Sequence, residues 1–173
     1  MSEQATRPLP RLRFPKGIDA DGHLLEPPDL WERYLEPRYR DRALRIRTDP
    51  ADGLEYLEID GRPSKLMRRG MLSGVGLMDR VGGIVHEREP TGSGYVDMAP
   101  LGAMDAAERV ERLDRENLDA VLLYPTLCAM WLAECEDEEI TQAYLRAYNR
   151  FILDFCSDSG GRLVPIASLS LGD

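Results

Sequence analysis

Hydrophobic residues follow two kinds of pattern along this chain. Continuous apolar runs at Ala120–Tyr124 and at 163–169 are typical of strands that are buried on both faces. Over 105–117 and 137–156, apolar residues instead recur at helical spacing. A shorter strand is expected at Ile18–His23, ahead of both. The order strand, helix, strand, helix, strand predicts an α/β fold with a parallel sheet and helices on its faces.

Capping residues indicate where the two long helices begin and end. Asp105 is a suitable N-cap, and Glu108 follows three residues later. Asn117 suits the left-handed position that ends a helix. Asp137 is the corresponding N-cap of the second helix, which Gly160 and the glycine after it stop. Two shorter helices are predicted at 29–35 and 127–133.

A large insertion, 38–104, separates the first strand from the first long helix. Within it, strands at 44–47 and 56–59 flank a turn-rich stretch, and the turn at Asp60 and Gly61 predicts a hairpin or a three-stranded flap. Residues 67–102 hold eight of the fifteen glycines. Such a segment is either a lid, a partner-contacting excursion or disordered chain. His86 lies there, and a lone loop histidine is more often solvated than a ligand.

Composition and charge narrow the function classes. The chain is 43% hydrophobic and 31% charged, as in globular domains, with a net charge of -9 that disfavours nucleic acid and anionic membrane surfaces. No apolar run is long enough to cross a membrane. We expect a mobile arm at 1–16 and one domain at 17–173. The three cysteines lack metal-site spacing, which indicates reduced thiols and a cytoplasmic location.

The candidate chemistry lies at the end of the first strand. Asp19, Asp21 and His23 alternate there, so in a regular strand they share one face. Two carboxylates and an imidazole begin a metal site but do not complete one. Without a metal, His23 would be satisfied by Asp19 or Glu26 at a capped strand end. Glu26 either reaches the mouth of the site or pins the turn.

Four stretches, in order, resemble one family. Residues 18–31, IDADGHLLEPPDLW, look like the opening of the amidohydrolase-related metal-dependent hydrolases, in the branch near aminocarboxymuconate semialdehyde decarboxylase and γ-resorcylate decarboxylase. Residues 112–126, 147–149 and 162–169 resemble later parts of the same family. Together these stretches cover most of the chain outside the insertion.

The resemblance implies a (β/α)₈ TIM-type barrel with a divalent metal at its C-terminal mouth. In that family the first strand ends in two metal ligands separated by one residue, which correspond here to Asp21 and His23. The metal would be Zn²⁺, Mn²⁺ or Fe²⁺, and a carboxylate ligand favours the latter two. The family's two later histidines and its last aspartate, which follow strands five, six and eight, have no counterpart in this chain.

An incomplete barrel implies a partner. Three parallel strands leave two unpaired edges, so we expect an N-terminal subunit of a split enzyme, in a hetero-oligomer with a second polypeptide that carries the remaining strands and ligands. That enzyme would hydrolyse or decarboxylate a small organic acid, with its general base on the partner. The alternatives are a fragment of a full-length hydrolase, a non-catalytic structural or regulatory half-barrel, and a substrate-binding module that acts alone.

Four residues are candidates for substrate contact. Tyr124 and Thr126 follow the second strand, where barrel enzymes carry active-site residues. Trp131 either lines an apolar pocket or packs in the core. Glu26 is the fourth, if it reaches the mouth of the site.

Overall fold

The computed structural model describes residues 17–75 and 92–170 of the 173. The predicted arm at 1–16 lies outside the described residues. So does the middle of the glycine-rich segment, 76–91, with His86.

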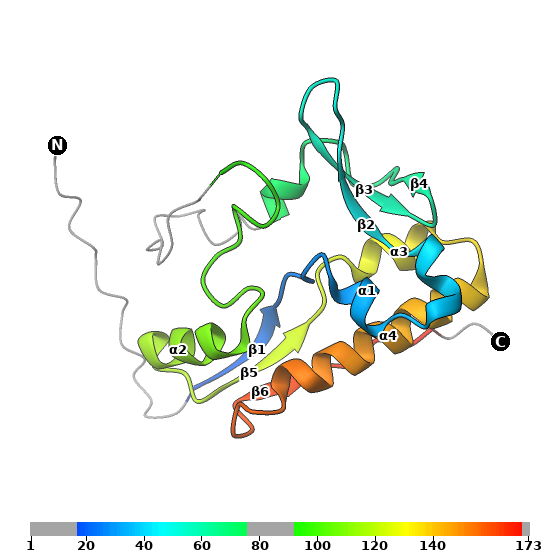
Figure 1. The fold of residues 1–173 in the computed structure, drawn as a ribbon. Helices are drawn as coiled ribbons and strands as arrows, with labels where there is room; N and C mark the ends of the chain where they lie inside the picture. The colour runs from blue at the N-terminus through cyan, green and yellow to red at the C-terminus, as the bar shows by residue number, and fades with distance from the viewer. Residues whose placement is uncertain (1–16, 76–91, 171–173) are drawn as a thin grey trace, which may run out of the picture.

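The centre of the fold is a parallel sheet of three strands, in the order β1-β5-β6 (Figure 1). These strands are β1 (Ile18–His23), β5 (Ala120–Tyr124) and β6 (Leu163–Pro165). The crossover from β1 to β5 contains α2 (Ala106–Glu116), and the crossover from β5 to β6 contains α4 (Glu138–Cys156). The predicted parallel α/β sheet is therefore confirmed.

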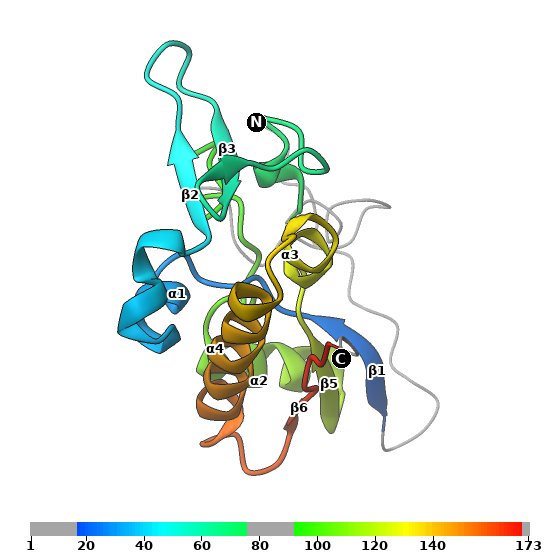
Figure 2. The same ribbon diagram turned by 90° about the vertical axis from the view of Figure 1, so that its right-hand side faces the viewer.

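The two faces of this sheet differ in burial. Val121 and Leu123 of β5 are buried, together with Leu163 of β6, which pairs with Val121. Helix α4 lies along one side of the sheet (Figure 2). Leu122 and Val164, which pair with each other on the opposite face, are only half-buried. The described chain thus covers one face of the sheet and leaves the other partly open.

The predicted caps form as expected. The Asp105 side chain accepts a hydrogen bond from Glu108 N at 2.9 Å and so satisfies one of the free N–H groups at the start of α2. Asn117 ends the helix in the left-handed conformation, with φ 58°. The Asp137 side chain caps α4 by accepting from Glu139 N at 2.9 Å.

Aromatic side chains pack the helices together. Trp31 of α1 (Leu30–Tyr34) meets Trp131 of α3 (Cys128–Glu134) edge to face, with ring centroids 4.9 Å apart. Tyr144 of α4 lies 5.2 Å from Trp31. All three rings are at most 1% exposed. Pairs of this geometry add about 1 kcal/mol each to the free energy gained by burying their surface.

A second sheet, antiparallel, extends from the helical layer. It contains β2 (Arg45–Thr48), β3 (Glu55–Ile59) and β4 (Arg62–Pro63), so the flap predicted from the turn residues has three strands. Asp60 and Gly61 form the β3–β4 turn with φ of 51° and 72°.

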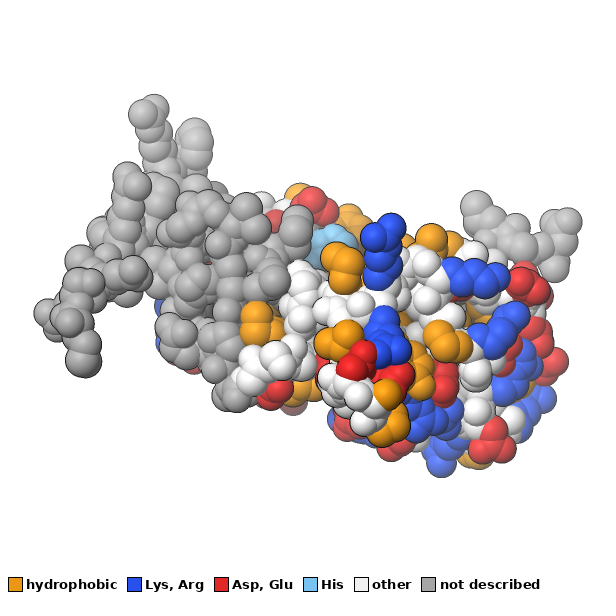
Figure 3. All heavy atoms as spheres, turned by 90° about the horizontal axis from the view of Figure 1, so that it is seen from above, with side chains coloured by type: hydrophobic (Ala, Val, Ile, Leu, Met, Phe, Trp, Pro, Cys, Tyr) orange, Lys and Arg blue, Asp and Glu red, His pale blue; other side chains and the backbone are white. Residues whose placement is uncertain are grey.

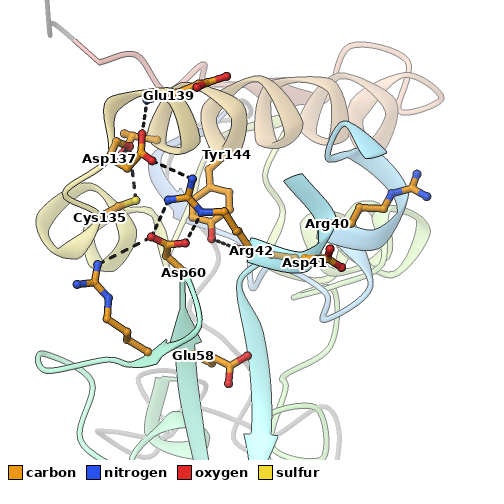
Figure 4. Close-up of polar contacts among 12 residues, drawn as sticks. Arg40, Asp41, Arg42, Glu58, Asp60, Cys135, Asp137, Glu139 and Tyr144 are labelled. Carbon is orange, nitrogen blue, oxygen red and sulfur yellow. Dashed lines mark hydrogen bonds and ion pairs between the residues drawn. The ribbon is translucent and has the colours of Figure 1, made fainter. Parts of the chain in front are cut away.

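One arginine fixes this flap to the rest of the molecule (Figure 4). Arg42, at the end of the 3₁₀ helix η1 (Pro37–Arg42), binds both carboxylate oxygens of Asp60, with the Nη2–Oδ2 distance at 2.8 Å. It also pairs with Asp137 at 2.8 Å, and its carbonyl accepts a hydrogen bond from the Tyr144 hydroxyl. The flap turn and the start of α4 therefore share one cation.

The last strand is shorter than predicted. The apolar run at 163–169 indicated a strand over its whole length, but β6 ends at Pro165. Beyond it, the Asn149 side chain takes the place of a neighbouring strand. Its Oδ1 accepts from Ser168 N at 2.9 Å, and its Nδ2 donates to Ser168 O at 3.0 Å.

Within the described ranges 17–75 and 92–170, no helix is both long enough and apolar enough to cross a membrane.

The unequal burial of the two sheet faces can be tested on adjacent residues. We expect Leu123→Ala to lower the free energy of unfolding by about 2–5 kcal/mol, because it empties a fully buried site. Leu122→Ala should cost about 1 kcal/mol, because this side chain is only half-buried. Urea unfolding followed by circular dichroism measures both. Equal losses would contradict the open face.

Candidate metal centre

The His23 ring is held in one tautomer at the end of β1. Its Nδ1 lies 3.1 Å from Pro125 O. A carbonyl oxygen only accepts hydrogen bonds, so Nδ1 carries a proton, and in the neutral ring Nε2 then presents a lone pair. Nε2 lies 3.9 Å from Asp21 Oδ1. A backbone carbonyl that fixes the far nitrogen is the usual support of a metal-binding histidine.

The His23 backbone is held from two other elements. Arg109 of α2, only 7% exposed, donates from Nε to Gly102 O at 2.7 Å and from Nη2 to His23 O. The Thr126 hydroxyl donates to Leu24 O at 2.5 Å. The strand end is therefore fixed before any ligand binds. The sequence analysis did not identify Arg109 as a residue of this site, because an arginine in an amphipathic helix is normally expected to be solvated.

Gly22 allows β1 to lie close to β5. A Cβ atom there would lie 2.1 Å from Val121 Cγ2, so any other residue would force the Val121 side chain or one of the strands to move. The register shifts between Asp19 and Gly22, which interrupts the strict alternation expected for the acidic cluster. Asp19 Oδ1 accepts from Asp21 N at 3.0 Å within this irregular stretch. Asp19 thus shapes the backbone that carries Asp21.

Glu26 joins the loops that follow β1 and β5. It is 1% exposed, and its Oε1 accepts from Thr126 N at 3.0 Å and from Leu127 N at 2.9 Å. Burial raises the Glu26 pKa to about 7, against the lowering effect of these backbone N–H groups. The Glu26 side chain joins the two loops and is not among the residues that line the cavity described below, so its position favours the second of the two roles considered, that of pinning the turn.

A cavity of about 890 Å³ opens beside the strand end. Asp19, Asp21 and His23 line one wall. Seen from above, the described surface carries acidic and basic side chains interspersed with hydrophobic ones, and a histidine side chain is visible on it (Figure 3). The volume falls within the usual range for small-molecule sites.

The strand end fits half of a metal site. The Asp21 and His23 side chains are 94% and 53% exposed, so both donors are accessible. Two metal bonds of about 2.0–2.2 Å can span the 3.9 Å between their donor atoms. Among residues 17–75 and 92–170, however, no group of three or more His, Cys, Asp or Glu side chains is arranged to hold an ion. Further ligands of an ion at this strand end would have to come from residues outside these ranges or from a second chain.

The other predicted contact residues occupy different places. Thr126 lines the cavity, and its hydroxyl is 3.4 Å from His23 Nδ1. Tyr124 lies beside His23, with ring centroids 5.9 Å apart, but is not part of the cavity wall. Trp131 is fully buried in the aromatic core, so its position favours packing over substrate contact.

The three cysteines carry free thiols. Burial raises the pKa of both Cys128 and Cys156 to about 11. Neither thiol is therefore ionised near neutral pH, and neither is suited to act as a nucleophile.

Comparison with known proteins adds a fold-level likeness. No protein-family model matches this sequence, and neither does any curated protein. The structure is similar to a crystal structure of an amidohydrolase from Mycobacterium avium subsp. paratuberculosis K-10, with a TM-score of 0.65 and 19% identity. At this identity the likeness concerns the fold alone. The likeness covers 94% of this chain and 44% of that one, so the chain spans less than half the length of its structural neighbour.

The buried Glu26 carboxyl predicts a pH dependence of stability. Its folded-state pKa of about 7 exceeds the ordinary value of 4.5, so the folded protein retains a proton that the unfolded chain has lost. Relative to Glu26→Gln, the wild-type free energy of unfolding should therefore fall between about pH 4.5 and pH 7, by up to about 3 kcal/mol. Urea unfolding at several pH values measures this difference. A parallel pH dependence of the two proteins would contradict it.

Proposed function

We propose that this chain forms part of a metal-dependent amidohydrolase-type enzyme, which hydrolyses or decarboxylates a small organic acid. Asp21 and His23 provide two ligands of a divalent ion, Zn²⁺, Mn²⁺ or Fe²⁺. The observation that carries the proposal is the His23 ring, whose Nδ1 donates to Pro125 O and whose Nε2 faces Asp21. The fold likeness to an amidohydrolase supports the reaction class.

In this proposal the ion and the chain have different tasks in the reaction. A bound divalent ion supplies either a water of lowered pKa or a polarised substrate oxygen. The chain orients the ligands. Pro125 O fixes the His23 tautomer, Arg109 holds the His23 carbonyl, and Asp19 holds the Asp21 backbone. Thr126 presents a hydroxyl to the same cavity.

A second polypeptide, in our proposal, supplies the remaining strands, the remaining ligands and the general base. The open sheet face around Leu122 and Val164 supports this. Ile18, at the start of the outer strand β1, is 65% exposed. Among the described residues, no strand pairs with the outer edges of β1 and β6. A parallel sheet with such edges and a partly open face favours association with further strands. The same surfaces would be covered if the chain were a fragment of a longer hydrolase, or a half-barrel that only stabilises its partner.

Metal binding tests the ligand assignment. Mn²⁺ added to the isotope-labelled chain should broaden the amide resonances around Gly22, His23 and Thr126 first, because the unpaired electrons of the ion relax nearby nuclei. His23→Ala should abolish this local broadening, and Asp21→Asn should weaken it about tenfold in Mn²⁺ concentration, the loss expected of one ligand contact.

Asp158→Asn is the matched control, since it removes an exposed carboxylate at the far end of α4. It should leave the broadening unchanged. Broadening that persists in His23→Ala would remove the support for a metal at this strand end.

Self-association tests the open face. We expect the isolated chain to associate in sedimentation velocity over a concentration series, because the sheet face around Leu122 is partly apolar and uncovered. Leu122→Lys should reduce this association. Leu132→Lys, which replaces a 40% exposed residue on α3, should leave it unchanged. A clean monomer at every concentration would argue against the partner-completed barrel.

A further inference from the structure

Three arginines line the cavity, and they differ in what they bind. Arg109 donates hydrogen bonds to Gly102 O and His23 O. Arg112 donates from Nε to Glu116 Oε1 at 2.9 Å, and its side chain is only 15% exposed. The Arg68 side chain, in contrast, makes no hydrogen bond or ion pair within the described parts of the chain, and it is exposed to the cavity.

The backbone before Arg68 is anchored to α3. Glu134, the last residue of that helix, accepts hydrogen bonds from the Ser64 hydroxyl, from Lys65 N at 2.5 Å and from Leu66 N at 3.2 Å. Ser64 Oγ in turn accepts from Met67 N at 2.9 Å. These contacts place Leu66, Met67 and Arg68 in succession along the cavity wall.

The backbone after Arg68 is anchored to the flap. Gly70 N donates to Glu55 O at 2.8 Å, and Arg69 pairs with Asp49 at 2.9 Å and with Asp52. Two adjacent arginines therefore have different surroundings. The charge of Arg69 is compensated by Asp49 and Asp52 in the hairpin turn. Arg68 lines the cavity, and no described residue pairs with its charge.

From this arrangement we propose that Arg68 binds the carboxylate of an organic acid in the cavity. The proposal rests on the proposed function and names the residue that binds its substrate. A guanidinium matches a carboxylate with two parallel hydrogen bonds. A phosphate dianion fits less well, because one arginine satisfies few of its oxygens and the carboxylates of Asp19 and Asp21 line the same cavity.

The rest of the cavity indicates what the acid carries. Leu25, Leu66, Met67, Met71 and Ala103 supply an apolar lining. The ligand is thus amphipathic, with an apolar body against these side chains. Its carboxylate meets Arg68 on the wall formed by the insertion, and its reacting group lies toward Asp21 and His23 on the wall formed by β1.

A pair of shape-matched probes tests this. In titrations followed by NMR, 2-naphthoate should bind the chain about tenfold more tightly than neutral 2-naphthamide, a ratio equivalent to about 1.4 kcal/mol. Arg68→Met should remove that preference, and Arg68→Lys should retain part of it. Arg69→Met is the matched control, since it removes the same charge one residue away, and it should keep the preference.

The test separates this inference from the metal proposal. His23→Ala should lose the Mn²⁺ effect yet keep the preference for naphthoate, whereas Arg68→Met should do the reverse. Equal binding of the two probes to the wild type, or an unchanged preference in Arg68→Met, would overturn the role of Arg68 and leave the metal assignment standing.

Discussion

The candidate site depends most on the hydrogen bonds that the Glu26 carboxylate accepts. It is buried, and it accepts hydrogen bonds from Thr126 N and Leu127 N. The loop after β1 is thereby tied to the loop after β5. That tie sets Pro125 O against the His23 ring and the Thr126 hydroxyl against Leu24 O. Because a buried acceptor without its donors costs roughly 1–3 kcal/mol, the two loops are expected to move as one unit.

The unequal faces of the sheet explain why this rigid strand end holds only part of a site. The helix-covered face is filled by residues such as Val121 and Leu163 and is a complete core. The other face bears Leu122, Val164 and the Tyr124 ring beside His23. In a closed barrel the corresponding face is the filled interior. Under the proposed function, Asp21 and His23 would therefore lie at the rim of a barrel interior that the described residues of this chain do not fill.

Patterns among neighbouring residues predicted much of the fold, but they did not predict contacts between residues that are far apart in the sequence. The order of strands and helices, the caps at Asp105 and Asp137 and the three-stranded flap all follow from neighbouring residues. The end of β6 at Pro165 does not, because Asn149 reaches it from another element. Prediction of the site from the sequence was limited in the same way. Asp21 and His23 are close in sequence, whereas the partnership of His23 with Pro125 and Arg109 joins residues about a hundred positions apart.

The cavity has two walls of different origin, and this division has a consequence for specificity. The wall that carries Asp21 and His23 belongs to β1, which lies close to β5 where Gly22 approaches Val121. The opposite wall belongs to the insertion, which is held by Glu134 and by Arg42 through Asp60. No hydrogen bond of the Glu134 anchor involves the strand end. Residues between Ser64 and Met71 can therefore change the shape and charge of the pocket while the geometry around His23 stays the same. The substrate choice and the metal binding that we propose would then be separable.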